Sequence, residues 1–206
     1  MPTWFERTLV AAFAAGFAAA ASAAAVVGQP APAFSAVDTA GRTVSLADFK
    51  GRTVVLEWVN PGCPFVQKHY GSANMQGTQA EAVAKGVVWL AVNSTAPDAY
   101  DYKPPAEMAA WMQQQKARAS ATLMDSDGKV GRAYGARTTP HLYVIDPAGK
   151  LVYAGAIDSK PTARVADIQS ATNYVKQALG ESLAGKAVGT PVTTSYGCSI
   201  KYSSGA

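Results

Sequence analysis

The feature that most restricts the fold of this chain is a largely apolar segment, residues 53–59, that ends in Asn60-Pro-Gly and is followed at once by Cys63 and Pro64. Its β-branched residues predict a buried strand. Proline suits the first turn of a helix, where its missing N–H is not needed. Cys63 is therefore predicted at a helix N-terminus, whose unpaired N–H groups and dipole favour the reactive thiolate. The alternative is a buried structural cysteine.

Further strands and helices are predicted along the chain. Residues 87–92 form a second, continuously apolar run, typical of a central strand covered on both faces. The alternation of strands and helices predicts an α/β fold, with a central mixed β-sheet flanked by helices and an N-terminal β-hairpin. Sites in open sheets lie beyond the carboxyl ends of the strands, so Cys63 and the loop 93–105 are expected on one rim. The other predicted elements are a hairpin over 35–46, a helix over 64–85 that breaks near Gly71 or Gly77, helices over 106–116, 129–134 and 161–179, and strands over 121–124, 141–145 and 151–154.

Composition excludes several classes of function. Charged residues make up 16% of the chain, and its net charge of +4 includes no run of lysine or arginine, so a nucleic-acid partner is not expected. The two cysteines and two histidines have none of the paired spacings of a zinc site. We therefore expect neither a metal nor another cofactor.

The N-terminal sequence predicts export. Residues 9–27 are uncharged and rich in alanine, and small residues at Ala23, Ala24 and Ala25 offer alternative cleavage positions. Residues 1–25 are thus interpreted as a signal peptide that meets the membrane only transiently, with a retained membrane anchor as the alternative. The mature protein is expected in the periplasm or outside the cell, where disulfides persist. It would comprise a domain over 28–183 and a C-terminal tail over 184–206 that carries Cys198.

Six segments together resemble one known family. The chain is similar to the peroxiredoxin-like redoxins, the alkyl hydroperoxide reductase and thiol-specific antioxidant family of the thioredoxin-fold superfamily. The resemblance implies a thioredoxin-like fold and redox chemistry at Cys63, with a small oxidant or a protein thiol or disulfide as partner. The matching segments are Asn60-Pro-Gly-Cys-Pro-Phe-Val-Gln-Lys-His69, Asn93-Ser94, Arg132-Ala-Tyr-Gly-Ala136, Thr138-Thr-Pro-His-Leu-Tyr-Val-Ile-Asp146, Lys150-Leu-Val-Tyr-Ala-Gly155 and Gly197-Cys-Ser-Ile-Lys-Tyr202.

The resemblance assigns roles to positions around the thiol. Thr139-Pro140 matches a threonine and cis-proline that face the active cysteine, although an ordinary trans proline would also fit the sequence. Glu57 matches a buried carboxylate that shuttles a proton from a thiol; an ion-paired or edge-facing glutamate is the alternative. Asn60 and Pro64 flank Cys63 and are expected beside its sulfur.

Three departures from the family pattern bear on activity. Val66 stands where thioredoxins have their second cysteine, so the chain has no local dithiol. Asn60 replaces the peroxidatic threonine or serine, and Pro140 stands where an arginine is usual. Asn60, Thr139, Lys68 and Arg137 are the nearest candidates to hold a peroxide.

Cys198 and the histidines leave several interpretations open. Cys198 is a possible resolving cysteine for Cys63, half of a structural Cys63–Cys198 disulfide, or a free thiol. His69 lies about 240° around a helix from Cys63, so we expect a surface or capping residue. His141 is interpreted as a core residue or, alternatively, a catalytic one.

Two classes of function follow. The first is an exported thiol oxidoreductase with an antioxidant or thiol–disulfide role, in which Cys63 is the nucleophile and Cys198 the possible resolving cysteine. The second is a non-enzymatic periplasmic binding module of thioredoxin fold, stabilised by a structural Cys63–Cys198 disulfide. Copper delivery is disfavoured because the chain has no C-x-x-x-C pair.

Overall fold

The computed structural model describes residues 24–203; nearly all of the predicted signal peptide lies outside this range. Within the range, no helix has the length and apolar character needed to cross a membrane. The elements in chain order are β1 (Ser35–Asp38), β2 (Thr43–Ser45), the 3₁₀ turn η1 (Leu46–Phe49), β3 (Val54–Trp58), α1 (Pro64–Gly71), α2 (Asn74–Ala84), β4 (Val88–Asn93), α3 (Pro105–Gln114), β5 (Ala121–Met124), α4 (Lys129–Tyr134), β6 (Thr138–Thr139), β7 (His141–Ile145), β8 (Leu151–Gly155), η2 (Val165–Ser170), α5 (Tyr174–Leu183) and β9 (Cys198–Ser199).

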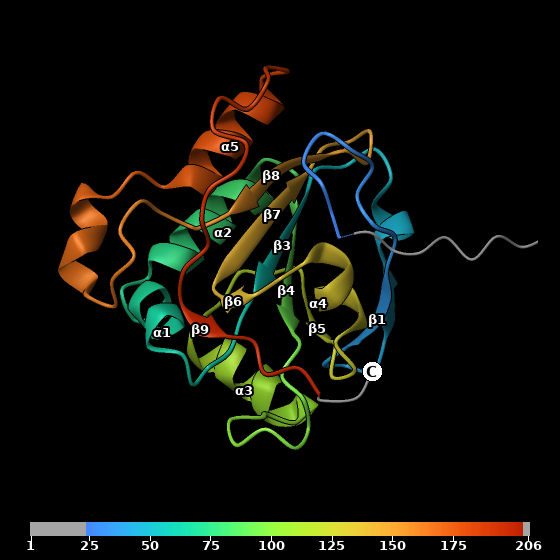
Figure 1. Ribbon diagram of the computed structural model, residues 1–206, viewed down its shortest axis with the longest axis vertical. Coiled ribbons are helices and arrows are strands. Elements are labelled where there is room, and N and C mark those ends of the chain that lie inside the picture. The colour runs from blue at the N-terminus through green and yellow to red at the C-terminus, as the bar shows by residue number, and fades with distance from the viewer. Residues whose placement is uncertain (1–23, 204–206) are drawn as a thin grey trace, which may run out of the picture.

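Seven strands form one mixed sheet in the order β2-β1-β5-β4-β3-β7-β8 (Figure 1). The strands β3, β4 and β5 run parallel, whereas β1 and β7 are antiparallel to their neighbours. β3 and β4 are buried along their whole length, as their apolar sequences predict. The predicted α/β fold with a central mixed sheet and an N-terminal hairpin is confirmed.

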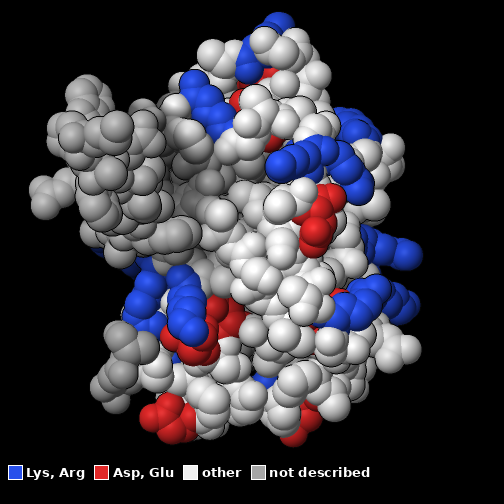
Figure 2. All heavy atoms as spheres, turned by 90° about the vertical axis from the view of Figure 1, so that its right-hand side faces the viewer, with Lys and Arg blue, Asp and Glu red and all other residues white. Residues whose placement is uncertain are grey.

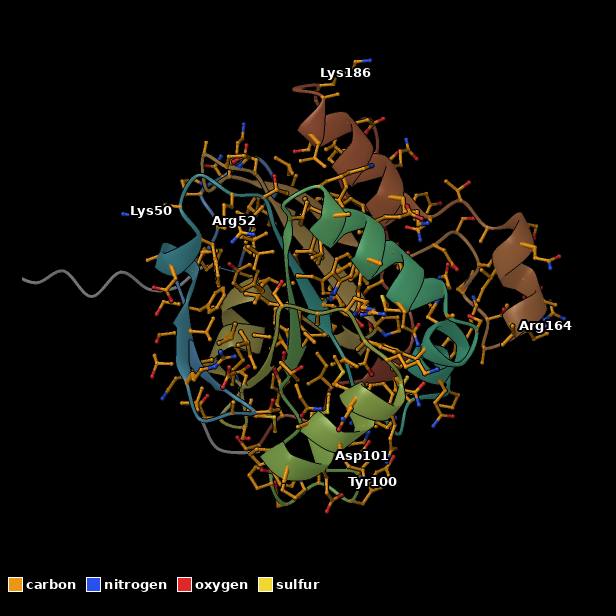
Figure 3. All side chains as sticks on the ribbon, turned by 180° about the vertical axis from the view of Figure 1, so that it is seen from behind. Lys50, Arg52, Tyr100, Asp101, Arg164 and Lys186 are labelled. Carbon is orange, nitrogen blue, oxygen red and sulfur yellow. The ribbon has the colours of Figure 1, made fainter. Side chains whose placement is uncertain are left out.

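Helices cover both faces of this sheet. Because side chains alternate along a strand, Val55 packs in the core shared with α1, α2, α3 and α5, while Leu56 packs in the core shared with α4. Figure 1 shows α4 in front of the sheet, and Figure 3 shows α2 and α3 in front when the molecule is seen from behind. β3 is thus packed between the two cores, and its carboxyl end leads to Cys63.

The helix predicted over 64–85 is broken, as expected, near Gly71. α1 ends at this glycine, and Ala73 adopts a left-handed conformation with φ of 59° before α2 begins. Glycine has a low helix propensity, which favours a stop here. The break leaves α1 as a short helix that belongs to the site.

The prediction of a single helix over 161–179 is wrong. The chain leaves the body at Asp158 and returns at Asn173, where these two residues form a β-bridge. The residues between them make a projecting loop with the short turn η2, seen in orange in Figure 1. Asn173 caps α5 by accepting the Lys176 N–H at 2.9 Å, so the helix begins there and continues to Leu183.

The C-terminal segment, residues 184–203, lies along the domain. Residues 191–193 pair with the edge strand β8: the Ala154 N–H donates to Pro191 O at 3.0 Å, and the Thr193 N–H donates to Ala154 O at 3.1 Å. Further along, β9 pairs antiparallel with β6. Glycines allow this close packing, since a Cβ on Gly155 would lie 2.1 Å from Thr193 Oγ1.

Candidate active site

Cys63 occupies the N-cap position of α1, with Pro64 at the first helical position. Its thiol is 1% exposed, and Sγ donates to the Thr139 carbonyl oxygen at 2.9 Å. Pro64 itself is exposed. The predicted position of the cysteine at a helix N-terminus is confirmed.

The peptide bond between Thr139 and Pro140 is cis, as the sequence comparison with redoxins implied. Both residues are buried. The Thr139 Oγ1 atom is buried without a hydrogen-bond partner among the described residues. The site therefore contains one unused hydroxyl donor next to the carbonyl that holds Cys63.

Cys198 lies on the other side of Thr139. It is the residue directly opposite Thr139 in the β6–β9 pair, and it is half-buried. Both cysteines are free thiols. Burial raises the pKa of Cys198 to about 12, and the nearby Cys63 thiol acts in the same direction. The fold thus brings both cysteines to Thr139 although they are far apart in the sequence.

Asn60 serves the loops around the thiol rather than the thiol itself. Its Oδ1 accepts the Gly62 N–H at 2.7 Å, and its amide donates to Thr95 Oγ1 at 3.0 Å and to Asp101 Oδ2 at 3.1 Å. With all three bonds made inside the protein, the buried side chain ties the turn before Cys63 to the loop 93–105. This loop was expected on the same rim, and these bonds confirm that placement.

Replacing Asn60 by alanine is expected to lower the free energy of unfolding by about 1–3 kcal/mol, because Thr95 and the Gly62 N–H lose a buried partner. Urea unfolding measures this change. The matched control Gln113→Ala, on the exposed face of α3, should stay within about 0.5 kcal/mol of the parent. Equal stability of the two variants would contradict the bridging role of Asn60.

Glu57 is fully buried within the core. Its carboxylate accepts from Trp89 Nε1 at 2.7 Å, Tyr70 OH at 2.9 Å and Gln79 Nε2 at 3.0 Å. Burial raises the pKa of Glu57 to about 7, against the opposing effect of these three donors. The buried position that the family resemblance implied for Glu57 is confirmed, while its hydrogen bonds go to core residues and not to either sulfur.

The prediction of a surface or capping role for His69 is wrong. His69 is buried, with Nδ1 2.8 Å from Asn74 Nδ2 and Nε2 3.2 Å from the Tyr196 hydroxyl. That hydroxyl donates to Asp158, so it accepts from His69, and His69 carries its proton on Nε2. Burial lowers the pKa of His69 to about 4, assisted by the charge of Lys68, which keeps the ring neutral at pH 7.

Lys68 is also buried, which removes it from the candidates for holding a peroxide. Its Nζ lies 3.4 Å from Asp158 Oδ2 and 3.0 Å from the Lys160 carbonyl oxygen. No pattern in the sequence indicates that Asp158 and Tyr196 join Lys68 and His69. These two residues come from distant segments, and only the folded chain brings them together.

His141 and Arg137 lie beside the cis-proline rather than at the thiol. His141 is buried, and its Nδ1 is 3.3 Å from the Tyr143 hydroxyl and accepts the Arg137 N–H at 3.3 Å. Burial lowers the pKa of His141 to about 4, with a further contribution from Arg137. The core interpretation of this histidine agrees with these contacts. The exposed Arg137 lines a surface hollow of about 460 Å³, together with residues 192–195 of the C-terminal segment.

The loop 93–105 is joined to the C-terminal segment. Lys201 Nζ contacts Asp101 Oδ2 at 2.6 Å and lies 4.9 Å from the centre of the Tyr100 ring. Figure 3 shows Tyr100 and Asp101 beside α3, at the opposite end of the sheet from Lys50 and Arg52. The latter two line a cavity of about 450 Å³ near the start of β3, so this cavity is separate from the cysteine pair.

The described residues provide no group of three or more histidine, cysteine or acidic side chains arranged to hold a metal ion. On the face shown in Figure 2, lysines and arginines are interspersed with acidic residues and do not form one continuous patch. The reactive groups gathered around Thr139 are two thiols and its own buried hydroxyl.

The sequence profile of the AhpC/TSA family matches residues 27–154. The thiol-disulfide oxidoreductase ResA of Bacillus subtilis is 27% identical over 132 residues, which cover 61% of this chain and 64% of that protein. The chain thus spans less than two thirds of the length of this relative. A ResA of Bacillus thuringiensis is 25% identical over 133 residues, covering 61% of this chain and 67% of its own.

Solved structures with similar folds extend over more of the chain. An uncharacterized conserved protein from Geobacillus kaustophilus has a TM-score of 0.75 and 28% identity, covering 88% of this chain and 94% of its own. A hypothetical protein from Sinorhizobium meliloti has a TM-score of 0.74 and 26% identity, covering 89% and 98%. A putative thiol:disulfide interchange protein DsbE from Chlorobium tepidum has a TM-score of 0.54 and 25% identity, covering 76% and 100%.

Proposed function

The chain belongs to the AhpC/TSA family, and from this premise we propose that it is a thiol–disulfide oxidoreductase whose redox pair is Cys63 and Cys198. The observation that carries the proposal is that two free thiols flank Thr139: Cys63 Sγ donates to its carbonyl oxygen, and Cys198 lies opposite it in the β6–β9 pair. This pair takes the place of the Cys-x-x-Cys dithiol of thioredoxins, which the chain lacks because Val66 stands at the second cysteine position. The names of the relatives, thiol-disulfide oxidoreductase and thiol:disulfide interchange protein, support the same class of reaction.

The reaction takes place in two exchange steps. The Cys63 thiolate attacks one sulfur of a partner disulfide, so a mixed disulfide forms, the partner's S–S bond breaks, and its second sulfur leaves as a thiolate. Cys198 then loses its proton and attacks the Cys63 sulfur. The Cys63–Cys198 disulfide forms and the remaining partner sulfur leaves, so the partner gains two electrons and the chain loses two. The reverse sequence oxidises a partner dithiol.

The two thiols have different roles in this scheme. Cys63 has the helix N-terminus beneath it, which stabilises a thiolate. The raised pKa of Cys198, about 12, keeps that sulfur protonated until the second step. Glu57, whose pKa is about 7, is our candidate for the group that finally takes up this proton. The sequence of events is therefore nucleophile first, resolving thiol second.

A second candidate substrate is a hydroperoxide. The buried, unpartnered Thr139 hydroxyl favours it, because such a donor can bind a substrate oxygen beside Cys63. Cys63 would attack the outer peroxide oxygen and release an alcohol or water, leaving a sulfenic acid. Attack by Cys198 would then form the disulfide and release water. We place peroxide reduction second to thiol–disulfide exchange, because Asn60 replaces the peroxidatic threonine or serine of the family.

Export remains part of the proposal. Its support is the uncharged, alanine-rich run over residues 9–27 and the small residues at Ala23 to Ala25. In a periplasmic or secreted setting a protein disulfide is an available partner. The expected mature protein consists of the domain over 28–183 and the segment after it.

Titration of thiols tests the cysteine pair. The reduced chain, mixed with an equimolar amount of bis(2-hydroxyethyl) disulfide, is expected to lose both of its thiols and to release two mercaptoethanol molecules per chain. Peptide mapping should find one disulfide joining Cys63 and Cys198. A product that stays as a mixed disulfide on Cys63, with Cys198 still free, would contradict the role of Cys198.

A further inference from the structure

The backbone edge of β6 is already occupied by the chain's own C-terminal segment. β9 pairs with it in antiparallel register, Thr138 with Ser199 and Thr139 with Cys198. The Ile200 N–H also donates to the Arg137 carbonyl oxygen at 3.0 Å. Such main-chain pairing is available to any extended peptide, whichever molecule it comes from.

The Tyr196 side chain, two residues before Cys198, is held by polar and aromatic side chains of the domain. The Tyr196 hydroxyl donates to Asp158 Oδ1 and contacts His69 Nε2 at 3.2 Å. The ring packs edge-on against Phe65, with centroids 5.8 Å apart, and Lys68 Nζ lies 5.7 Å from its centre. Asp158, His69 and Lys68 are all buried. Two buried polar side chains, Asp158 and His69, thus hold the hydroxyl group, and the buried Lys68, next to His69 on α1, lies near the ring.

The residue between Tyr196 and Cys198 must be very small. Gly197 has a φ of 131°, and a Cβ built on it would lie 2.0 Å from the Thr139 carbonyl oxygen. That oxygen belongs to the backbone and accepts the Cys63 thiol, so it has no room to move aside. Only glycine lets the strand approach the Thr139 backbone this closely.

Resting on the proposed function, we infer that this surface is a docking site for an extended, cysteine-bearing segment of a partner protein. The surface consists of β6, Phe65, His69 and Asp158, and residues 196–200 of the chain itself occupy it as an internal substitute. A partner segment would therefore carry the same pattern: tyrosine two residues before the reacting cysteine, glycine one before it, and a small and then an aliphatic residue after it. Ile200 supplies the aliphatic contact by packing against the apolar core on the α4 side.

The internal strand must leave before such a partner binds. Cys63 is 1% exposed while the strand is in place. Once the strand has left, the partner's strand pairs with β6 and presents its disulfide to Cys63. The Cys63 thiolate bonds to the sulfur of the partner cysteine, the partner's S–S bond breaks, and the other sulfur leaves with the electron pair as a thiolate.

The test uses the full chain with Cys198→Ser, so that Cys63 is the one remaining thiol. A second change, Gly197→Ala, displaces the internal strand, while Gly180→Ala, in open space on α5, is the matched control. The probe is the peptide Thr-Ser-Tyr-Gly-Cys-Ser-Ile-Lys-Tyr with thionitrobenzoate bonded to its cysteine. Release of thionitrobenzoate gives the rate of reaction with Cys63.

We expect the peptide to react about tenfold faster with the Gly197→Ala chain than with the Gly180→Ala chain, since the internal strand no longer competes for the edge. On the Gly197→Ala chain, peptides with alanine for glycine or phenylalanine for tyrosine should each react about tenfold more slowly, the cost of losing a close approach or a charged hydrogen bond. If Gly197→Ala fails to fold, Tyr196→Phe serves as the loosening change instead.

A scrambled peptide that reacts as fast as the tyrosine-glycine-cysteine peptide would overturn the docking site. Bis(2-hydroxyethyl) disulfide serves as a small substrate that needs no docking. If Cys63 reacts with it but shows no preference among the peptides, the inference is wrong and the proposed function stands. If Cys63 reacts with neither, both are wrong.

Discussion

Replacing Cys198 by serine is expected to stop turnover after the first exchange step and to leave a mixed disulfide on Cys63. The second step needs a thiol close to the Cys63 sulfur, and β9 supplies one within the same molecule when it pairs with β6 again. An external thiol at millimolar concentration replaces it poorly, so turnover should fall roughly 10²-fold or more. Non-reducing gels and intact mass measure the trapped adduct.

Cys63→Ser is the matched control for this experiment. It removes the thiol at the helix N-terminus and leaves Cys198, whose pKa is still raised by burial, so that it stays protonated at neutral pH. This variant should form no adduct and show no turnover. An adduct on Cys198 in the Cys63→Ser chain would reverse the assignment of nucleophile and resolving thiol.

The second large effect concerns the stability of the core around Glu57. Its pKa is about 7 in the folded chain and about 4.5 when exposed. Between these values the unfolded chain ionises while the folded chain stays protonated, so the contribution of Glu57 to stability is full below pH 4.5 and is lost as the pH rises to 7. The loss amounts to about 3 kcal/mol, since one pKa unit corresponds to about 1.4 kcal/mol.

Comparison with Glu57→Gln isolates this effect. The lowered pKa values of the buried His69 and His141, both about 4, act in the opposite direction, because the unfolded histidines take up protons below pH 6.5. These histidines are common to both chains and cancel. The stability of the parent relative to Glu57→Gln should therefore fall by about 3 kcal/mol between pH 4.5 and 8 in urea unfolding. A pH-independent difference would refute the raised pKa.

Glu57→Ala is expected to destabilise the chain by at least about 3 kcal/mol, because the Trp89, Tyr70 and Gln79 donors are left unsatisfied in the core. Glu81→Ala on the exposed side of α2 is the control. Its ion pair with Lys176 is on the surface, so that change should cost less than about 1 kcal/mol.

Local patterns were sufficient to predict the frame of the site. The β-branched run before Asn60 and the proline after Cys63 act through neighbouring residues, and both β3 and the N-cap cysteine follow from them. The cis bond before Pro140 and the burial of Glu57 came from the family resemblance rather than from propensity. These predictions succeeded because each depends either on neighbouring residues in the sequence or on a short motif shared with the family.

The predictions that failed depend on contacts between distant segments. The angle of His69 from Cys63 around one helix predicts a surface or capping residue. Contacts with Asp158 and Tyr196, from distant segments, bury it instead. The helix expected over 161–179 has adequate propensity, yet the bridge between Asp158 and Asn173 closes the chain into a loop. Asn173, a good N-cap residue, was the one local sign of where α5 begins.

The pairing of residues 191–193 with β8 has a consequence for the behaviour of the protein in solution. β8 is the last strand of the sheet, and these residues take up backbone groups at its outer edge. Withdrawal of the C-terminal segment far enough to free Cys63 would loosen this cover as well. An uncovered strand edge pairs readily with the same edge of another molecule. The opened protein is therefore expected to self-associate, and dilution should favour the closed monomer.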